Sequence, residues 1–446
     1  MKNGVGSTAP PERVGRRGAR RSGDAAPLLA WPRERSQDET PPQAGLVVAG
    51  LFAGIGGIEL GLHRAGHSSA LLCENDPGAL AVLGARFPGV PLEKDVRLLD
   101  SLPAETNLLA AGFPCQDLSQ AGMTRGIQGP RSGLIGEVFR LLRRQPVPWL
   151  LLENVPFMLQ LGRGRALEVI VSELESLGYR WAYRVVNSRA FGLPQRRERV
   201  FLLASMQHDP RPILFADDAS PPNDDPNDRG QAFGFYWTEG TRGLGWAVDA
   251  VPTLKGGSTV GIPSPPAILF PSGEIVTPDL RDAERMQGFS ADWTRPAEQV
   301  TRRSFRWRLV GNAVTVHVSA WIGRRLATPG RYDGTWDQQL PKGSPWPRAA
   351  WNVGHGRHAS DVSAWPMRRA LKPLREFLRF PTPPLSLKAA EGFRSRTKTS
   401  SLRFRPGFLE AVDAHIRLMR QSSSNGPAVP RGSRSSRSSA PPAAPY

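Results

Sequence analysis

The chain has 446 residues, enough to bury a sizeable core and to form two domains or one large domain with appendages. Its two cysteines exclude a disulfide framework, and we find neither an apolar signal segment nor a run long enough to span a bilayer, so we expect a cytoplasmic protein without membrane contacts. The net charge of +18 fits a polyanionic partner, but residues 331–446 alone carry 20 basic and 7 acidic residues, so the charge lies mostly in the C-terminal part.

Residues 1–205 divide into an unpatterned segment and a strongly patterned one. Residues 1–44 are rich in Arg, Pro, Gly and Ser, and we expect a disordered basic segment. From residue 45 onward, short apolar runs alternate with stretches of helical spacing. Strands are predicted within 45–57, 68–76, 92–96, 107–113, 147–155, 179–188 and 199–205, and helices within 58–66, 77–87, 133–144 and 166–178. This alternation predicts an α/β fold with a doubly wound, mostly parallel sheet that is covered on both faces.

The second half of the chain changes character twice. Residues 206–278 are rich in Pro, Gly, Asp and Ser, and this stretch is too long for an ordinary loop, so we expect a smaller irregular lobe. Helical spacing resumes within 279–328, a range that we assign with 45–205 to one domain. The remaining ranges are a linker at 329–345, a small basic C-terminal extension at 346–420 and a disordered tail at 421–446.

A glycine loop and two acids follow successive predicted strands. The stretch "FAGIGG" ends a strand and opens a helix, where backbone N–H groups favour a polar or anionic ligand. Its glycines, Gly54, Gly56 and Gly57, do not have the dinucleotide-binding spacing and could form only a tight turn. Glu74 and Asp95 end the next two strands, where acids can bind a ribose or an adenine amine but are often merely solvated. The three features in strand order favour a cofactor that contains a nucleoside.

One of the two cysteines follows a predicted strand directly. In "GFPCQDLS" the strand runs into Pro114 and Cys115, which places the thiol at the carboxyl edge of the sheet. A cysteine taken out of context is more often buried and inert. Cys115 is flanked by Gln116, Asp117 and Ser119, however, and a helix that begins here could lower its pKa and supply a thiolate. The setting favours a nucleophile.

Two further segments bring charge to the same edge. "WLLLENV" places Glu153 and Asn154 at the end of a neighbouring strand, and a carboxyl beside a thiol suits attack on an electron-poor ring. Glu153 would need a raised pKa for that role. In "QRRERVF", strand alternation would place Arg197 and Arg199 on one face, where they could hold a carbonyl or a phosphate or form part of a solvated charge run.

These blocks together resemble a known family. "FAGIGG", "CEND", "KD", "GFPCQDLS", "RSGLIGEVF", "LLENV", "QRRER", "RDAERMQGF" and "GNAV" occur in the order found in cytosine-5 DNA methyltransferases of the bacterial restriction-modification or orphan type. The resemblance covers residues 46 to about 326. It implies an S-adenosylmethionine-dependent Rossmann-like domain, with 206–278 as the target-recognition domain.

The resemblance implies a role for each catalytic position. Cys115 resembles the nucleophile that adds to cytosine C6, and Glu153 resembles the residue that contacts N3 and the exocyclic amine. Arg199 resembles the arginine that binds the cytosine O2, and Arg197 resembles its partner near the nucleophile. Addition at C6 activates C5 for methyl transfer, and the target base must be flipped out of the duplex.

The resemblance also implies the methyl donor and the partners. S-adenosylmethionine is the expected methyl donor and no metal is expected, since the sequence has no Cys/His cluster. Double-stranded DNA is the expected partner of a monomer, with a cognate restriction endonuclease as a possible companion. The expected cofactor-binding residues are Phe52, Gly54, Gly56, Gly57, Glu74, Asn75, Asp95, Pro114, Leu134 and Asn312. The expected DNA-binding residues are Gln116, Ser119, Arg242 and Lys255.

The charge of the predicted target-recognition domain is unusual for a lobe that binds DNA, because residues 207–279 carry 4 basic and 10 acidic residues. The acids cluster at 209–228, and we expect that part to face away from phosphate while 229–265 approaches the duplex.

Three other functions compete with this interpretation. An RNA methyltransferase of the same fold would have a short recognition region with a Cys-Phe-Thr tripeptide, which this sequence lacks. A non-enzymatic DNA-binding regulator is disfavoured because Cys115, Glu153 and Arg199 are all present. A nicotinamide-dependent dehydrogenase is disfavoured by the glycine spacing.

Overall fold

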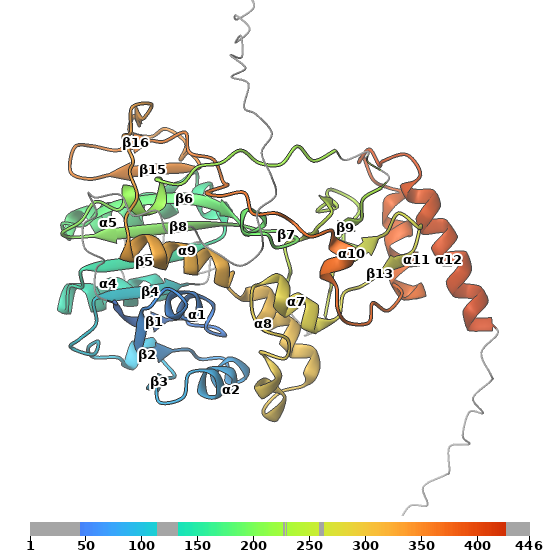
Figure 1. The fold of residues 1–446 in the computed structure, drawn as a ribbon, viewed down its shortest axis with the longest axis horizontal. Coiled ribbons are helices and arrows are strands. Elements are labelled where there is room, and N and C mark those ends of the chain that lie inside the picture. Colours follow the sequence, from blue (N-terminus) through green and yellow to red (C-terminus); the bar gives the residue numbers. More distant parts are fainter. Residues whose placement is uncertain (1–44, 114–132, 226–227, 229, 258–262, 425–446) are drawn as a thin grey trace, which may run out of the picture. The chain divides into compact units, whose positions relative to one another are not determined.

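The computed structural model describes residues 45–113, 133–225, 228, 230–257 and 263–424. Within these ranges, one large sheet contains ten strands in the order β14-β16-β15-β6-β8-β5-β4-β1-β2-β3 (Figure 1). Its parallel half consists of β1 (Val47–Leu51), β2 (Ser68–Cys73), β3 (Leu92–Glu93), β4 (Leu108–Gly112) and β5 (Trp149–Asn154). Its antiparallel half consists of β6 (Arg180–Asn187), β8 (Glu198–Ser205), β14 (Gln338–Gln339), β15 (Ala349–Asn352) and β16 (His358–Ala359).

Helices cover both faces of this sheet, so the predicted α/β fold is confirmed. On one face, α1 (Gly57–His63) and α9 (Val316–Ala327) pack against the apolar side chains of β1, β4 and β5. On the other face lie α4 (Gly133–Arg144) and α5 (Arg165–Ser176), whose apolar stripes are buried. The central parallel strands β1, β4 and β5 are buried almost throughout, as expected when both faces are covered, whereas β2 and β3 toward the edge are partly exposed.

A second, four-stranded sheet forms what we call the small lobe, residues 230–278. Its strands follow the order β10-β9-β12-β13 and are β9 (Phe233–Phe235), β10 (Ala247–Val248), β12 (Ala267–Leu269) and β13 (Ile275–Val276). A short parallel pair joins the small lobe to the large domain, β7 (Gln195–Arg196) with β11 (Val251–Pro252).

The described residues also form several short helices. They are α2 (Pro77–Arg86), α6 (Arg211–Leu214), α7 (Leu280–Met286), α8 (Arg306–Asn312) and α10 (Leu374–Phe377). The 3₁₀ turns are η1 (Val96–Leu98), η2 (Pro156–Leu159), η3 (Ser188–Phe191), η4 (Arg295–Gln299) and η5 (Arg303–Phe305). Asp76 caps α2 by accepting from the N–H groups of Gly78 and Ala79, and Pro77 occupies its first turn.

The start of the range 206–278 packs on the large domain instead of the small lobe. Helix α6 places Ile213, Leu214 and Phe215 in the core beside α9. The acids that follow it pair with arginines of the large domain, Asp217 with Arg325, Asp218 with Arg184 and Asp224 with Arg189. Three acids of the range 209–228 are therefore paired with arginines of the large domain.

The C-terminal part completes both the large sheet and the small lobe. Strand β15 pairs with β6 over four residues, so part of the predicted linker and extension belongs to the main sheet. Helices α11 (Leu387–Thr397) and α12 (Phe408–Ser424), which we call the C-terminal hairpin, pack on the small lobe (Figure 1). The sequence did not indicate these pairings, because β14 and β16 have two residues each and carry no apolar alternation.

Candidate active site

The ends of β4 and β5 lie side by side and are tied together. Gly112 is paired with Glu153 in the sheet register, and the Asn154 side-chain amide donates to the carbonyl oxygen of Phe113 at 3.0 Å. These contacts fix the chain at the residue directly before Pro114. Pro114 and Cys115 themselves lie outside the described residues, as do Gln116 and Ser119.

Glu153 forms a buried ion pair with Arg199. Arg199 Nε lies 3.1 Å from Glu153 Oε1, and the Glu153 side chain is largely buried. Burial raises the pKa of Glu153 above its usual range, although the positive charges of Arg199 and Arg197 oppose this shift. Burial thus favours the protonated form of the carboxyl group, the form that can donate a proton to a ring nitrogen.

Arg197 binds main-chain carbonyl groups of the small lobe and of the end of α8. Its guanidinium donates to the carbonyl oxygens of Leu254, Gly311 and Ala313 at 3.4, 3.1 and 2.7 Å. The residue is 1% exposed, and burial and the nearby charge of Arg199 lower its pKa. Three carbonyl partners make it a positioning residue that joins the small lobe and the end of α8 to the large domain.

The glycine loop forms an open turn after β1. Phe52 and Gly54 have φ angles of 54° and 55°, and an added Cβ at Gly54 would meet no atom within 4 Å. By contrast, a Cβ at Gly56 would collide with the Phe87 ring, and one at Gly57 with the carbonyl oxygen of Val314. Gly54 therefore borders open space, whereas Gly56 and Gly57 are required by close packing.

The predicted strand-end acids gather at the ends of β2 and β3. Glu74 Oε2 accepts from the Gly54 N–H and Oε1 from the N–H groups of Asn75 and Asp76, each at 2.8 Å. This ties the glycine loop to the next strand. Asp95 caps η1 and binds the guanidinium of Arg97, and the side-chain hydrogen bond from Arg97 lowers the pKa of Asp95.

Four other predicted site residues lie on separate elements. Leu134 is half-buried at the start of α4 and packs against the core, and Asn312 is exposed at the end of α8. Lys255 pairs with Glu239, and Arg242 is exposed in the loop between β9 and β10.

Sequence reasoning missed two residues next to the site. Tyr236 donates its hydroxyl hydrogen to the Thr253 carbonyl oxygen at 2.7 Å, and the centre of its ring lies 3.7 Å from the Lys255 ammonium.

The second residue, Glu59, is buried in α1, and burial raises its pKa to about 7. An acid within the otherwise apolar "GIELGL" is the sequence signal that could have identified Glu59.

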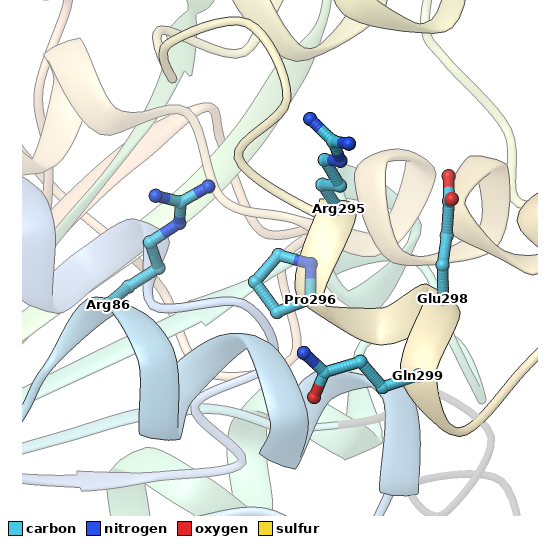
Figure 2. Close-up of a pocket in the computed structure, with 5 residues that line it drawn as sticks. All are labelled: Arg86, Arg295, Pro296, Glu298 and Gln299. Carbon is cyan, nitrogen blue, oxygen red and sulfur yellow. The ribbon is translucent and has the colours of Figure 1, made fainter.

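A hollow with a volume of about 420 Å³ lies between α2 and η4. Figure 2 shows the side chains that line it. It is lined by Arg86, Arg295, Pro296, Glu298 and Gln299, none of which is a predicted site residue. Arg86 is held by the carbonyl oxygens of Asp292 and Trp293, at 2.6 and 3.0 Å.

Within the described part of the chain, no three His, Cys, Asp or Glu side chains are grouped as metal ligands. No helix there is long and apolar enough to cross a membrane.

Comparison with known proteins identifies the family. A family model described as C-5 cytosine-specific DNA methylase matches residues 46–229. The Type II methyltransferase M2.BsuMI of Bacillus subtilis (strain 168) is 47% identical over 379 residues, which cover 82% of this chain and 97% of that protein. The chain belongs to the C-5 cytosine-specific DNA methylase family.

Other relatives match more narrowly. The Type II methyltransferase M.BanI of Aneurinibacillus aneurinilyticus is 39% identical over 170 residues, 37% of this chain and 39% of that protein. Among solved structures, the S. pombe Dnmt2 methyltransferase has a TM-score of 0.45 and 16% identity over 63% of this chain and 98% of its own. As a member of the C-5 cytosine-specific methylases, the protein is a DNA methyltransferase of type II.

Proposed function

We propose that this methylase transfers a methyl group from S-adenosylmethionine to C5 of a flipped-out cytosine in a specific duplex DNA site. Covalent addition of Cys115 to C6 would activate the ring. The observation that carries this proposal is the buried pair of Glu153 and Arg199 at the end of β5, beside the strand that leads into Cys115. A carboxyl group with a raised pKa next to an expected thiol suits this chemistry.

The chemistry proceeds in three steps on the base. The Cys115 thiolate forms a bond to C6 while the Glu153 carboxyl donates its proton toward N3, so that electron density reaches C5. The C5–methyl bond would then form as the sulfonium–methyl bond of the donor breaks, which leaves a neutral thioether. Loss of the C5 proton to water, return of the N3 proton to Glu153 and breakage of the C6–sulfur bond would restore the aromatic ring, the carboxyl group and the thiolate. Arg199 holds the O2 atom of the base, and the base must leave the duplex to reach these groups.

The residues around the glycine loop fit a nucleoside-containing methyl donor. When bound, S-adenosylmethionine supplies a methyl group made electrophilic by its sulfonium. Gly54 borders open space, and Glu74 lies within hydrogen-bond reach of the loop backbone, where it could bind ribose hydroxyls. Asp95 would accept from the adenine amine in place of part of its hydrogen bonding to Arg97. The other residues proposed for this site are Phe52, Gly56, Gly57, Asn75, Pro114, Leu134 and Asn312.

The family supports a proposal for the partners of the enzyme. Two similar proteins are named Type II methyltransferases, which supports a restriction-modification role with a cognate endonuclease. We propose that the enzyme acts as a monomer and contacts DNA through Gln116, Ser119, Arg242 and Lys255.

The test is direct. Unmethylated DNA is incubated with the protein and S-adenosylmethionine, and 5-methylcytosine is mapped by bisulfite sequencing. The expected result is methylation at one short sequence and covalent trapping of the wild type, but not of Cys115→Ser, on DNA that contains 5-fluorocytosine. Methylation by Cys115→Ser at the wild-type rate would refute the mechanism, and absence of any mark with the wild type would refute the activity.

A further inference from the structure

The C-terminal hairpin forms one half of the core of the small lobe. Its buried side chains, Phe393 on α11 with Phe408 and Val412 on α12, pack against Phe235 and Leu269 of the small sheet. The rings of Phe235 and Phe408 meet edge to face at a centroid distance of 5.1 Å. Without the hairpin, this face of the sheet would be apolar and open to water.

The end of α11 also binds the backbone of one loop of the small lobe. Arg396 donates to the carbonyl oxygens of Trp237 and Glu239 at 2.6 and 3.0 Å. Ser400 donates to the Thr241 carbonyl at 3.2 Å. Between them, Gly240 has a φ angle of 118° and approaches the Phe393 ring. Arg396 and its neighbours therefore fix the path of residues 237–241.

An ion pair connects the loop 237–241 to the chain segment at the active-site edge of the large sheet. The Glu239 carboxylate pairs with Lys255, whose ammonium also lies over the Tyr236 ring. The main chain at Lys255 packs closely against Gly311 at the end of α8, and the preceding carbonyl, that of Leu254, accepts from Arg197. A shift of the loop would thus move the Lys255 ammonium, while the main chain of Lys255 stays packed against α8.

We propose that the C-terminal hairpin is part of the target-recognition apparatus, with Arg396 as a positioning residue that fixes loop 237–241 and, through Glu239, the placement of Lys255 toward DNA phosphate. This inference rests on the proposed function, because it assigns a DNA-facing role to Lys255. Four observations carry it: the shared apolar core, the two carbonyl bonds of Arg396, the Ser400 bond and the Glu239–Lys255 pair. Arg396 acts on binding of the target, and it does not touch the reacting atoms.

The test compares Arg396→Met with the conservative Arg396→Lys. After bisulfite mapping of the wild-type target, KM and kcat are measured on a duplex with that target and on duplexes with one altered base pair. Loss of two charge-assisted hydrogen bonds is expected to raise KM for the target about tenfold and to reduce discrimination, with kcat and S-adenosylmethionine affinity within about twofold of wild type. Arg396→Lys is expected to recover part of the loss.

Arg420→Met is the matched control, because Arg420 lies on α12 and pairs only with Glu391 among the contacts described. It is expected to keep wild-type KM and discrimination. If Arg396→Met does not fold, Ser400→Ala removes a contact to the same loop from a half-buried position and should also raise KM.

A double-mutant cycle separates positioning from general destabilisation. If Arg396 acts through Lys255, the KM effects of Arg396→Met and Lys255→Met should be less than additive. A folded Arg396→Met with wild-type KM and discrimination, or fully additive effects, would overturn the inference. An inactive wild-type protein would instead refute the proposed function, so the two failures are distinguishable.

Discussion

At the scale of single residues, the fold places two carboxyl groups in apolar surroundings with different consequences. Glu153 has Arg199 as its partner and faces the edge of the sheet where Cys115 is expected. Glu59 lies in α1, its Oε2 atom has no hydrogen-bond partner among the described residues, and its pKa is raised to about 7 by burial. Glu153 is thus suited to chemistry, whereas Glu59 links stability to pH.

We expect Glu153→Gln to lower kcat by about 10²- to 10⁴-fold, because the amide cannot supply a proton to the ring. DNA affinity and thermal stability should stay close to wild type. Single-turnover methylation and covalent trapping on 5-fluorocytosine DNA measure the effect. Glu173→Gln on α5, which removes a surface partner of Arg143, is the control and should retain full activity. A Glu153→Gln enzyme with wild-type kcat would contradict the assignment.

Glu59 should make the protein less stable as pH rises. Its pKa in the folded state, about 7, exceeds the usual value of 4.5, so its contribution is fully present below pH 4.5 and is lost as pH rises through 7. The loss is about 3 kcal/mol. Denaturant unfolding at pH 5 and pH 8 should show that Glu59→Gln removes this component and is the more stable protein at pH 8. Glu93→Gln, at an exposed position, should leave the pH dependence unchanged.

At the scale of elements, Arg197 and Arg199 differ although strand alternation predicts the same face for both. Arg197 binds three main-chain carbonyls, and Arg199 binds the carboxylate of Glu153. Arg197→Met should lower the free energy of unfolding by about 3 kcal/mol, because the buried carbonyls lose their donors. Arg199→Met should mainly lower kcat. Urea unfolding and kinetics on the two variants measure this contrast, and equal stability losses would contradict it.

The sequence predicts the parallel half of the sheet well, because β1, β2, β4 and β5 are apolar runs bounded by helices of clear periodicity. It also predicts that Glu153 and Glu74 lie at strand ends. It could not predict the carbonyl partners of Arg197 or the pair of Lys255 with Glu239, because both depend on segments that are brought together only in the folded chain. The predicted roles of the site residues stay predictions.

At the scale of the whole molecule, the C-terminal part is a structural component of both sheets. Strand β15 covers the edge of β6. Its residue Ala350 packs in the hydrophobic core on one face of the large sheet, and Ala349 packs in the core on the opposite face. The C-terminal hairpin covers the small sheet. Within the described residues 331–424, the basic side chains therefore lie in a segment that contributes strands to the large sheet and helices to the small lobe.

A chain that ends at Gly330 should consequently be insoluble or aggregated, because it exposes the hydrogen-bonding edge of β6 and the apolar face of the small sheet at the same time. Co-expression of residues 331–446 as a separate polypeptide should restore soluble protein, since the same surfaces would again be covered. Soluble yield, size-exclusion chromatography and thermal unfolding measure both outcomes. A truncated chain that is monomeric and unfolds at the same temperature as the full chain would show that these pairings contribute little to the fold.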